Sequence, residues 1–159
     1  MNWAHVHLLF NHVPLVATAL GILLLAWSAA ARSEELRKGA YGLFVVGALL
    51  TLPTYFSGGP AEGVVKGLPG VTEAVIDPHE EAATVAAVVI GFLGVMALAA
   101  LVLAHGRPPV PAAFAAAVAI LAVAAVVLMA RAANLGGQIR HQEIRALPEP
   151  AAGSSGTTP

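Results

Sequence analysis

The sequence contains no cysteine, and only 11% of its 159 residues are charged. The lack of cysteine excludes disulfides, thiolate metal sites, iron–sulfur clusters and covalently attached c-type haem. A soluble domain of this size would carry roughly 25% charged residues. The net charge of −1 also argues against a nucleic-acid partner. Because 58% of the residues are hydrophobic, we expect the lipid bilayer to be the solvent of this chain.

The sequence contains four long apolar runs with few charged residues. A helix needs about 20 mostly apolar residues to cross the hydrocarbon core, and the runs cover about 13–31, 40–56, 82–104 and 111–135. Short turns at 32–39 and 105–110 make neighbouring spans antiparallel. The sequence therefore predicts an all-α, integral membrane four-helix bundle of up-down-up-down topology over residues 1–146. The polar tail 147–159 is predicted to be disordered.

Prolines mark the expected ends of two helices. Pro53 is expected to kink or stop the second span, and a short interfacial helix over 61–68 is expected in the loop that follows. Asp77 is a natural N-cap and Pro78 a natural first helical residue, so the third helix is expected to begin there.

Five of the six histidines are predicted to lie at one membrane surface, because the chain crosses the membrane between their positions. These are His5, His7, His12, His79 and His141. His105 is expected on the other side. On a continuous first helix His5 and His12 would share a face, and His7 would point elsewhere. His79 is expected to be neutral, because a cation at a helix N-terminus opposes the helix dipole.

A polar stripe is predicted at the end of the fourth helix. Steps of 3, 4, 3 and 4 join Arg131, Asn134, Gln138, His141 and Arg145. Ionisable groups inside a membrane usually face the bundle interior, so we expect the stripe to point inward. Snorkelling of the arginines to the interface is the alternative. Gly136 and Gly137 beside the stripe would let a bulky ligand approach the backbone.

Four short motifs occur in order along residues 5–145. They are His5-Val-His-Leu-Leu-Phe-Asn-His12-Val-Pro14, Thr54-Tyr-Phe-Ser-Gly-Gly59, His79-Glu80 and Gly136-Gly-Gln-Ile-Arg-His141. With them the chain resembles a broad family of uncharacterised four-span bacterial membrane proteins. Val-Pro after His12 departs from the family's Phe-Pro. Members are suspected b-type haem proteins, so the resemblance implies haem b as a cofactor.

Three functions follow from these features. The first is a membrane b-type haem protein that acts as a small electron-transfer subunit, rather than a stand-alone enzyme. His5 or His12 would pair with His79 or His141 on the iron, and Arg131, Arg145 or Lys66 would meet the haem propionates. Its partners would be a quinone, a cytochrome or a larger redox complex. The second is a non-haem metal site at His12, His79 and His141 with Glu80 or Glu81. The third is a structural accessory subunit of a larger membrane complex.

The distribution of basic residues predicts the orientation. One surface holds Arg32, Arg37, Lys38 and Arg107, and the other holds Lys66, Arg140 and Arg145. The positive-inside rule counts basic residues alone. It therefore predicts a multi-pass protein of the bacterial inner membrane with both termini on the periplasmic side.

Overall fold

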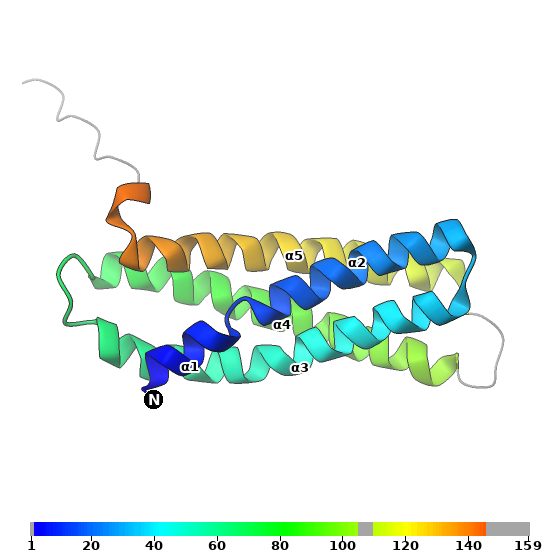
Figure 1. Cartoon of the computed structure of the whole chain (residues 1–159), viewed down its shortest axis with the longest axis horizontal. Helices are drawn as coiled ribbons and strands as arrows, with labels where there is room; N and C mark the ends of the chain where they lie inside the picture. The colour runs from blue at the N-terminus through cyan, green and yellow to red at the C-terminus, as the bar shows by residue number, and fades with distance from the viewer. Residues whose placement is uncertain (1, 105–109, 146–159) are drawn as a thin grey trace, which may run out of the picture.

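The computed structural model describes residues 2–104 and 110–145, which form a bundle of long antiparallel helices (Figure 1). The helices are α1 (Trp3–Phe10), α2 (Val13–Ala31), α3 (Glu34–Val65), α4 (Glu73–Leu103) and α5 (Ala112–Arg140), followed by a 3-10 turn, Gln142–Ile144. The predicted all-α four-helix fold is confirmed. The N-terminus, the α3–α4 loop and the end of α5 lie at one end of the bundle, and the α2–α3 turn lies at the other. The turn with His105 and the tail 147–159 lie outside the described residues.

The first span consists of two helices separated at Asn11 and His12. Pro14 has no N–H group, so the carbonyl oxygen of Phe10 loses its intrahelical donor. The Thr54 hydroxyl of α3 donates to that oxygen instead, at 3.1 Å. The continuous first helix expected from the sequence is therefore wrong, and with it the shared face of His5 and His12.

Helix α3 continues through Pro53 and Pro60 to Val65. The predictions that Pro53 could stop the span and that a separate helix covers 61–68 are both wrong. Hydroxyls on either side of Pro53 reinforce the helix. Thr51 donates to the carbonyl of Gly47 at 2.9 Å, and the single hydroxyl proton of Thr54 is shared between the carbonyls of Leu50, at 3.0 Å, and Phe10. Side-chain hydroxyls of this kind help membrane helices to tolerate proline.

Helix α4 begins at Glu73, with Thr72 as its N-cap, which is one turn before the predicted start at Asp77. Pro78 lies in the second turn. So close to the helix start it removes only one intrahelical bond, the one to the carbonyl of Ala74, and Ala74 is exposed. His79 therefore lies in the second turn of α4 rather than in its first turn. Helix α5 ends at Arg140, five residues after the predicted limit of its span.

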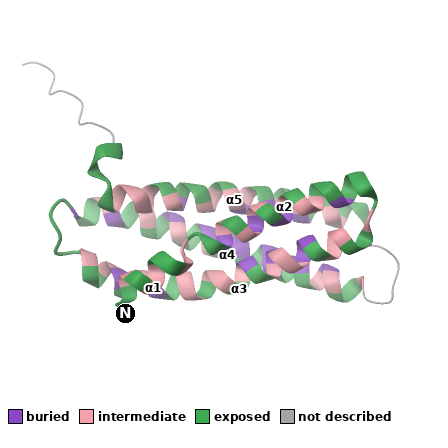
Figure 2. Ribbon diagram, in the orientation of Figure 1, coloured by how far each residue is buried: buried purple, intermediate pink, exposed green. Residues whose placement is uncertain are grey.

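Small residues let the helix backbones approach closely. A Cβ on Gly94 of α4 would collide with Ala48 of α3, and a Cβ on Gly21 of α2 would collide with Phe44. Close approach at small residues is the usual basis of helix packing in membranes. The largest fully buried apolar side chains are Tyr41, Phe44, Ile90, Leu93 and Val118. Buried positions line the inner faces and exposed positions the outer faces (Figure 2).

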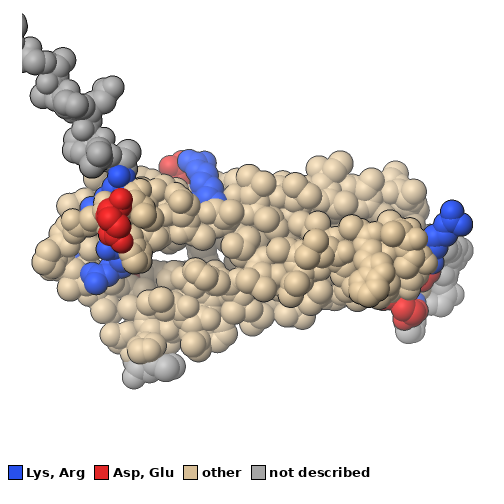
Figure 3. Space-filling model, turned by 45° about the horizontal axis from the view of Figure 1, so that its top comes forward, with Lys and Arg blue, Asp and Glu red and all other residues tan. Residues whose placement is uncertain are grey.

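Four helical segments are long and apolar enough to cross a membrane: Trp3–Ala31, Glu34–Val65, Glu73–Leu103 and Ala112–Arg140. The longest, with 32 residues, is about 48 Å long at 1.5 Å per residue, whereas the hydrocarbon core is about 30 Å thick. The helix ends therefore extend beyond the apolar layer. Charged side chains gather mainly at the two ends of the bundle and leave most of the middle uncharged (Figure 3).

Candidate functional site: two anchored histidines

His7 of α1 is fixed against α3. Its Nδ1 lies 3.0 Å from the carbonyl oxygen of Thr54 and 3.1 Å from the Ser57 hydroxyl oxygen. The Ser57 hydroxyl, which is buried, itself donates to the Thr54 carbonyl at 3.0 Å. Because a carbonyl oxygen can only accept, Nδ1 of His7 carries the proton.

His79 of α4 is fixed against α5 in the same way. Its Nδ1 lies 2.9 Å from the carbonyl oxygen of Ala132, so this nitrogen also donates. The imidazole packs on Gly136: a Cβ there would lie 2.9 Å from Cε1 and 3.1 Å from Nδ1 of His79. The space that Gly136 leaves is thus filled by His79 itself, and not by an external ligand as the sequence suggested.

His7 and His79 are each held by a hydrogen bond from Nδ1 to a backbone carbonyl, a contact that we call an anchor, and the two anchors follow the same pattern. In each, the imidazole reaches the carbonyl of a helical residue and the position four residues later is glycine: Thr54 with Gly58, and Ala132 with Gly136. A helical side chain leans toward the N-terminus and covers the turn before it. A larger residue at Gly136 would therefore crowd the imidazole of His79, whereas a Cβ at Gly58 would make only an ordinary contact with His7. His7 Cε1 lies 3.9 Å from where a Cβ on Gly58 would be.

The anchors leave both Nε2 atoms with a free lone pair. A neutral imidazole with its proton on Nδ1 has an acceptor at Nε2, and neither Nε2 atom has a hydrogen-bond partner among residues 2–104 and 110–145. The ring centroids of His7 and His79 lie 6.4 Å apart with an interplanar angle of 88°. Metal-bound histidines commonly donate their other ring N–H to a backbone carbonyl in this way, which fixes the tautomer and the orientation of the ring.

The separation of the two rings can be compared with that of two imidazoles bound to one metal ion. With metal–nitrogen bonds of about 2 Å, two imidazoles on opposite sides of an ion have ring centres about 6 Å apart. The surface is hollowed at this end of the bundle, between the side that carries α1 and α3 and the side that carries α5 (Figure 3). Within the described ranges no three His, Asp or Glu side chains converge as a compact metal ion would need. The described residues thus bring two imidazoles, His7 and His79, close together at this end of the bundle.

The other predicted histidines lie apart from this pair. His5 and His12 are exposed, and His12 is the N-cap of α2. His141 is exposed and pairs with Glu143, with 2.8 Å between Nδ1 and Oε1. The set His12, His79 and His141 does not form a common cluster within the described part of the chain.

The polar stripe of α5 does not face the bundle interior. Arg131, Asn134 and His141 are exposed, and Gln138 is half-buried and donates to Asn134 at 2.8 Å. The inward orientation expected from the sequence is wrong because alanine, here Ala132, takes the inner face of this turn. Glycine at 136 serves His79, whereas a Cβ on Gly137 would make only an ordinary 3.6 Å contact with Ile144.

The Arg145 side chain caps the C-terminal end of α5. Its guanidinium donates to the carbonyls of Gln138 at 2.7 Å and Ile139 at 3.0 Å, and to that of Gly70 in the α3–α4 loop at 2.9 Å. Lys66 is also engaged, with Glu62 at 3.2 Å and Glu73 at 2.9 Å. The sequence predicts Arg131, Arg145 and Lys66 as candidate partners of the haem propionates. Of these three, only Arg131 has no hydrogen-bond or ion-pair partner among the described residues.

His7 is the site residue that sequence reasoning missed. On a continuous first helix His7 would point away from His5 and His12, so the sequence does not place it among the candidate ligands. The helix break at Pro14 changes this, because it sets α1 against α3. The signal in the sequence is a glycine four residues after each acceptor: Gly58 follows Thr54, and Gly136 follows Ala132.

Comparisons with protein families, with curated proteins and with solved structures find no match to this chain.

Proposed function

We propose that this protein is a small membrane-bound b-type haem protein whose iron is held by His7 and His79. The observation that carries the proposal is the pair of Nδ1 anchors, which leave two Nε2 lone pairs on rings 6.4 Å apart. The ligands come from α1 and α4 and are supported by α3 and α5. Facing helices of a bundle are a common source of cofactor ligands.

Residues around His7 and His79 would contribute to haem binding in different ways. Thr54 and Ala132 hold the imidazoles in the tautomer that a ligand requires, and Gly136 makes room for the ring of His79. Arg131, exposed on α5 next to Ala132, is one cation without a side-chain partner among the described residues, and it would meet a propionate. A haem iron with both axial positions filled by histidine transfers single electrons.

An electron-transfer role requires a donor and an acceptor. We propose a quinone, a cytochrome or a larger redox complex as the partner, at the end of the bundle that carries the two histidines. We also propose that this end faces the periplasm of a bacterium, since Arg32, Arg37 and Lys38 lie at the opposite end. Alkaline phosphatase fused after Arg145 would then be active, and an inactive fusion would reverse this orientation.

The test is the reduced-minus-oxidised visible spectrum of the full chain, expressed with ample haem and purified in detergent. Bands of low-spin haem b are expected in the wild type, and His7→Ala or His79→Ala should remove them. His5→Ala is the matched control, since His5 lies on the same helix as His7 but is exposed. His7→Met should keep a bound haem and raise its potential, because methionine in place of histidine does so.

Two results would overturn the proposal. One is a colourless wild-type protein; metal analysis would then separate a non-haem site from a structural subunit. The other is a haem spectrum that survives both alanine substitutions, which would place the iron elsewhere.

A further inference from the structure

A groove of about 550 Å³ lies between α2 and α5, at the end of the bundle opposite the histidines. Its walls are apolar, with Ile22 and Leu25 from α2 and Ala115, Ala119 and Val123 from α5. Small residues on α5 leave this space open. The α5 wall from Ala115 to Val123 extends roughly 12 Å along the helix axis at 1.5 Å per residue.

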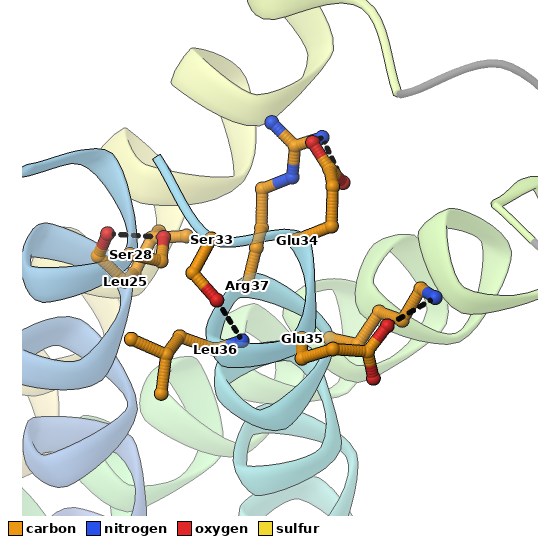
Figure 4. A network of polar contacts seen from close by, with 8 residues as sticks. Leu25, Ser28, Ser33, Glu34, Glu35, Leu36 and Arg37 are labelled. Carbon is orange, nitrogen blue, oxygen red and sulfur yellow. Dashed lines mark hydrogen bonds and ion pairs between the residues drawn. The ribbon is translucent and has the colours of Figure 1, made fainter. Parts of the chain in front are cut away.

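The mouth of the groove is polar and lies at the α2–α3 turn. It is formed by Ser28, Arg32, Ser33, Glu34 and Arg37. Figure 4 shows how most of these groups are already engaged. The Ser28 hydroxyl donates to the carbonyl of Leu25 at 2.6 Å, the Ser33 hydroxyl accepts from the N–H of Leu36 at 3.3 Å, and Arg37 pairs with Glu34.

Arg32 is the exception at this mouth. Its guanidinium has no hydrogen-bond or ion-pair partner among the described residues. Since Glu34 offsets Arg37, the mouth keeps one net positive charge. Arg32 also ends α2 in the left-handed conformation, with φ 51°, at a position where glycine is usual. A residue other than glycine held in this region is a sign of functional constraint.

The exposed side chain of Trp27 indicates how deep the groove lies in the bilayer. This side chain is exposed on the last turn of α2, and exposed tryptophan marks the interface between lipid and water. The mouth, only a few residues further on, lies at the headgroup level. Ile22, more than one helical turn deeper, lies at the level of the acyl chains.

We propose that this groove binds one anionic phospholipid, with an acyl chain against α2 and α5 and the headgroup phosphate on Arg32. An apolar channel below a single cation matches the order of groups in such a lipid. Basic pockets between membrane helices are known to select anionic headgroups. The site does not depend on haem and lies at the other end of the molecule.

The test is lipid retention by the full-length protein, purified in detergent and measured by native mass spectrometry after incubation with defined lipids. Palmitoyl-oleoyl phosphatidylglycerol should be retained roughly fivefold more than the phosphatidylcholine with the same chains, the effect of one basic residue. Arg32→Gln should abolish this preference and Arg32→Lys should preserve it. Inorganic phosphate at the same concentration should not compete.

Variants of α5 test the acyl-chain part of the site. Ala119→Leu should fill the groove and reduce retention of both lipids several-fold. Ala116→Leu is its matched control, because Ala116 is an exposed alanine of the same helix that does not line the groove. Equal retention of the two lipids by the wild type would overturn the proposal, as would an unchanged preference in Arg32→Gln. Equal behaviour of the two alanine variants would place the lipid elsewhere, and competition by phosphate would indicate a plain anion site.

Discussion

The substitution Gly136→Ala tests the anchor of His79 most directly. The added Cβ would lie 2.9 Å from Cε1 and 3.1 Å from Nδ1 of the imidazole. Carbon atoms in contact prefer a separation of about 3.5–4.0 Å, so the ring has to move. Movement away from α5 weakens its hydrogen bond to the Ala132 carbonyl. The prediction is therefore a less stable protein whose His79 is misplaced.

The expected loss can be assembled from three terms. Overpacking of a filled site costs about 1–3 kcal/mol, and loss of the hydrogen bond costs about 0.5–1.5 kcal/mol. Alanine in place of glycine within a helix returns about 1 kcal/mol. The free energy of unfolding should fall by roughly 2 kcal/mol, and the affinity of any ligand bound through His79 should fall with it.

Gly137→Ala is the matched control for this prediction. It has the same gain in helix propensity, but its Cβ would meet only Ile144 at an ordinary 3.6 Å, so it should be neutral or stabilising. Unfolding in mixed micelles of mild detergent and sodium dodecyl sulfate, followed by circular dichroism, compares the two. Equal stability of the two variants would refute the packing of His79 on Gly136.

Three further predictions concern groups away from His79. Thr54→Val removes the donor to the Phe10 carbonyl, and the free energy of unfolding should fall by about 1–3 kcal/mol in the same assay. Thr54→Ser should retain most of the stability. An unchanged stability of the Thr54→Val variant would contradict this role. Tyr41 has a buried hydroxyl with no partner among the described residues, so Tyr41→Phe should be neutral or stabilising, and a clear loss of stability would reveal an unrecognised bond. The pKa of the exposed Glu143 carboxyl is held below its usual value by its own backbone N–H and then by His141. The resulting stabilisation is present above the ordinary carboxyl pKa and is lost as pH falls through the lowered value. A carbon-13 NMR titration checks this, and a midpoint at the unfolded-peptide value would contradict it.

The four-helix fold could be predicted from the sequence because long apolar runs and short turns are local signals. The helix ends were less predictable. Pro53 was expected to limit its helix, but hydroxyls of Thr51 and Thr54 reinforce the backbone around it. Pro78 resembled a first helical residue, yet Thr72 caps α4 one turn earlier. The contacts around Pro53 involve hydroxyl groups that a one-dimensional pattern does not weigh, and the Thr72 side chain makes no capping hydrogen bond that would mark the earlier start of α4.

The candidate site was predicted only in part. His79 and Gly136 are both among the predicted site residues, and the structure places the imidazole against the glycine, a contact that the sequence does not predict. His7 was missed because its position depends on the break at Pro14 and on contacts with Thr54 and Ser57, about 50 residues away in the chain. Helical periodicity within one segment does not report such long-range contacts.

The two anchors determine when this site can form during biosynthesis. His7 emerges from the ribosome first, but its acceptor, Thr54, belongs to α3, and His79 finds Ala132 only on α5. Segments near the N-terminus are synthesised first, so contacts with later helices form only after those helices have been made. Until α5 is inserted, the imidazole of His79 lacks its acceptor at Ala132. A chain truncated before Ala132 would therefore lack one of the two anchors, and under the proposed function it would bind haem less well than the full chain.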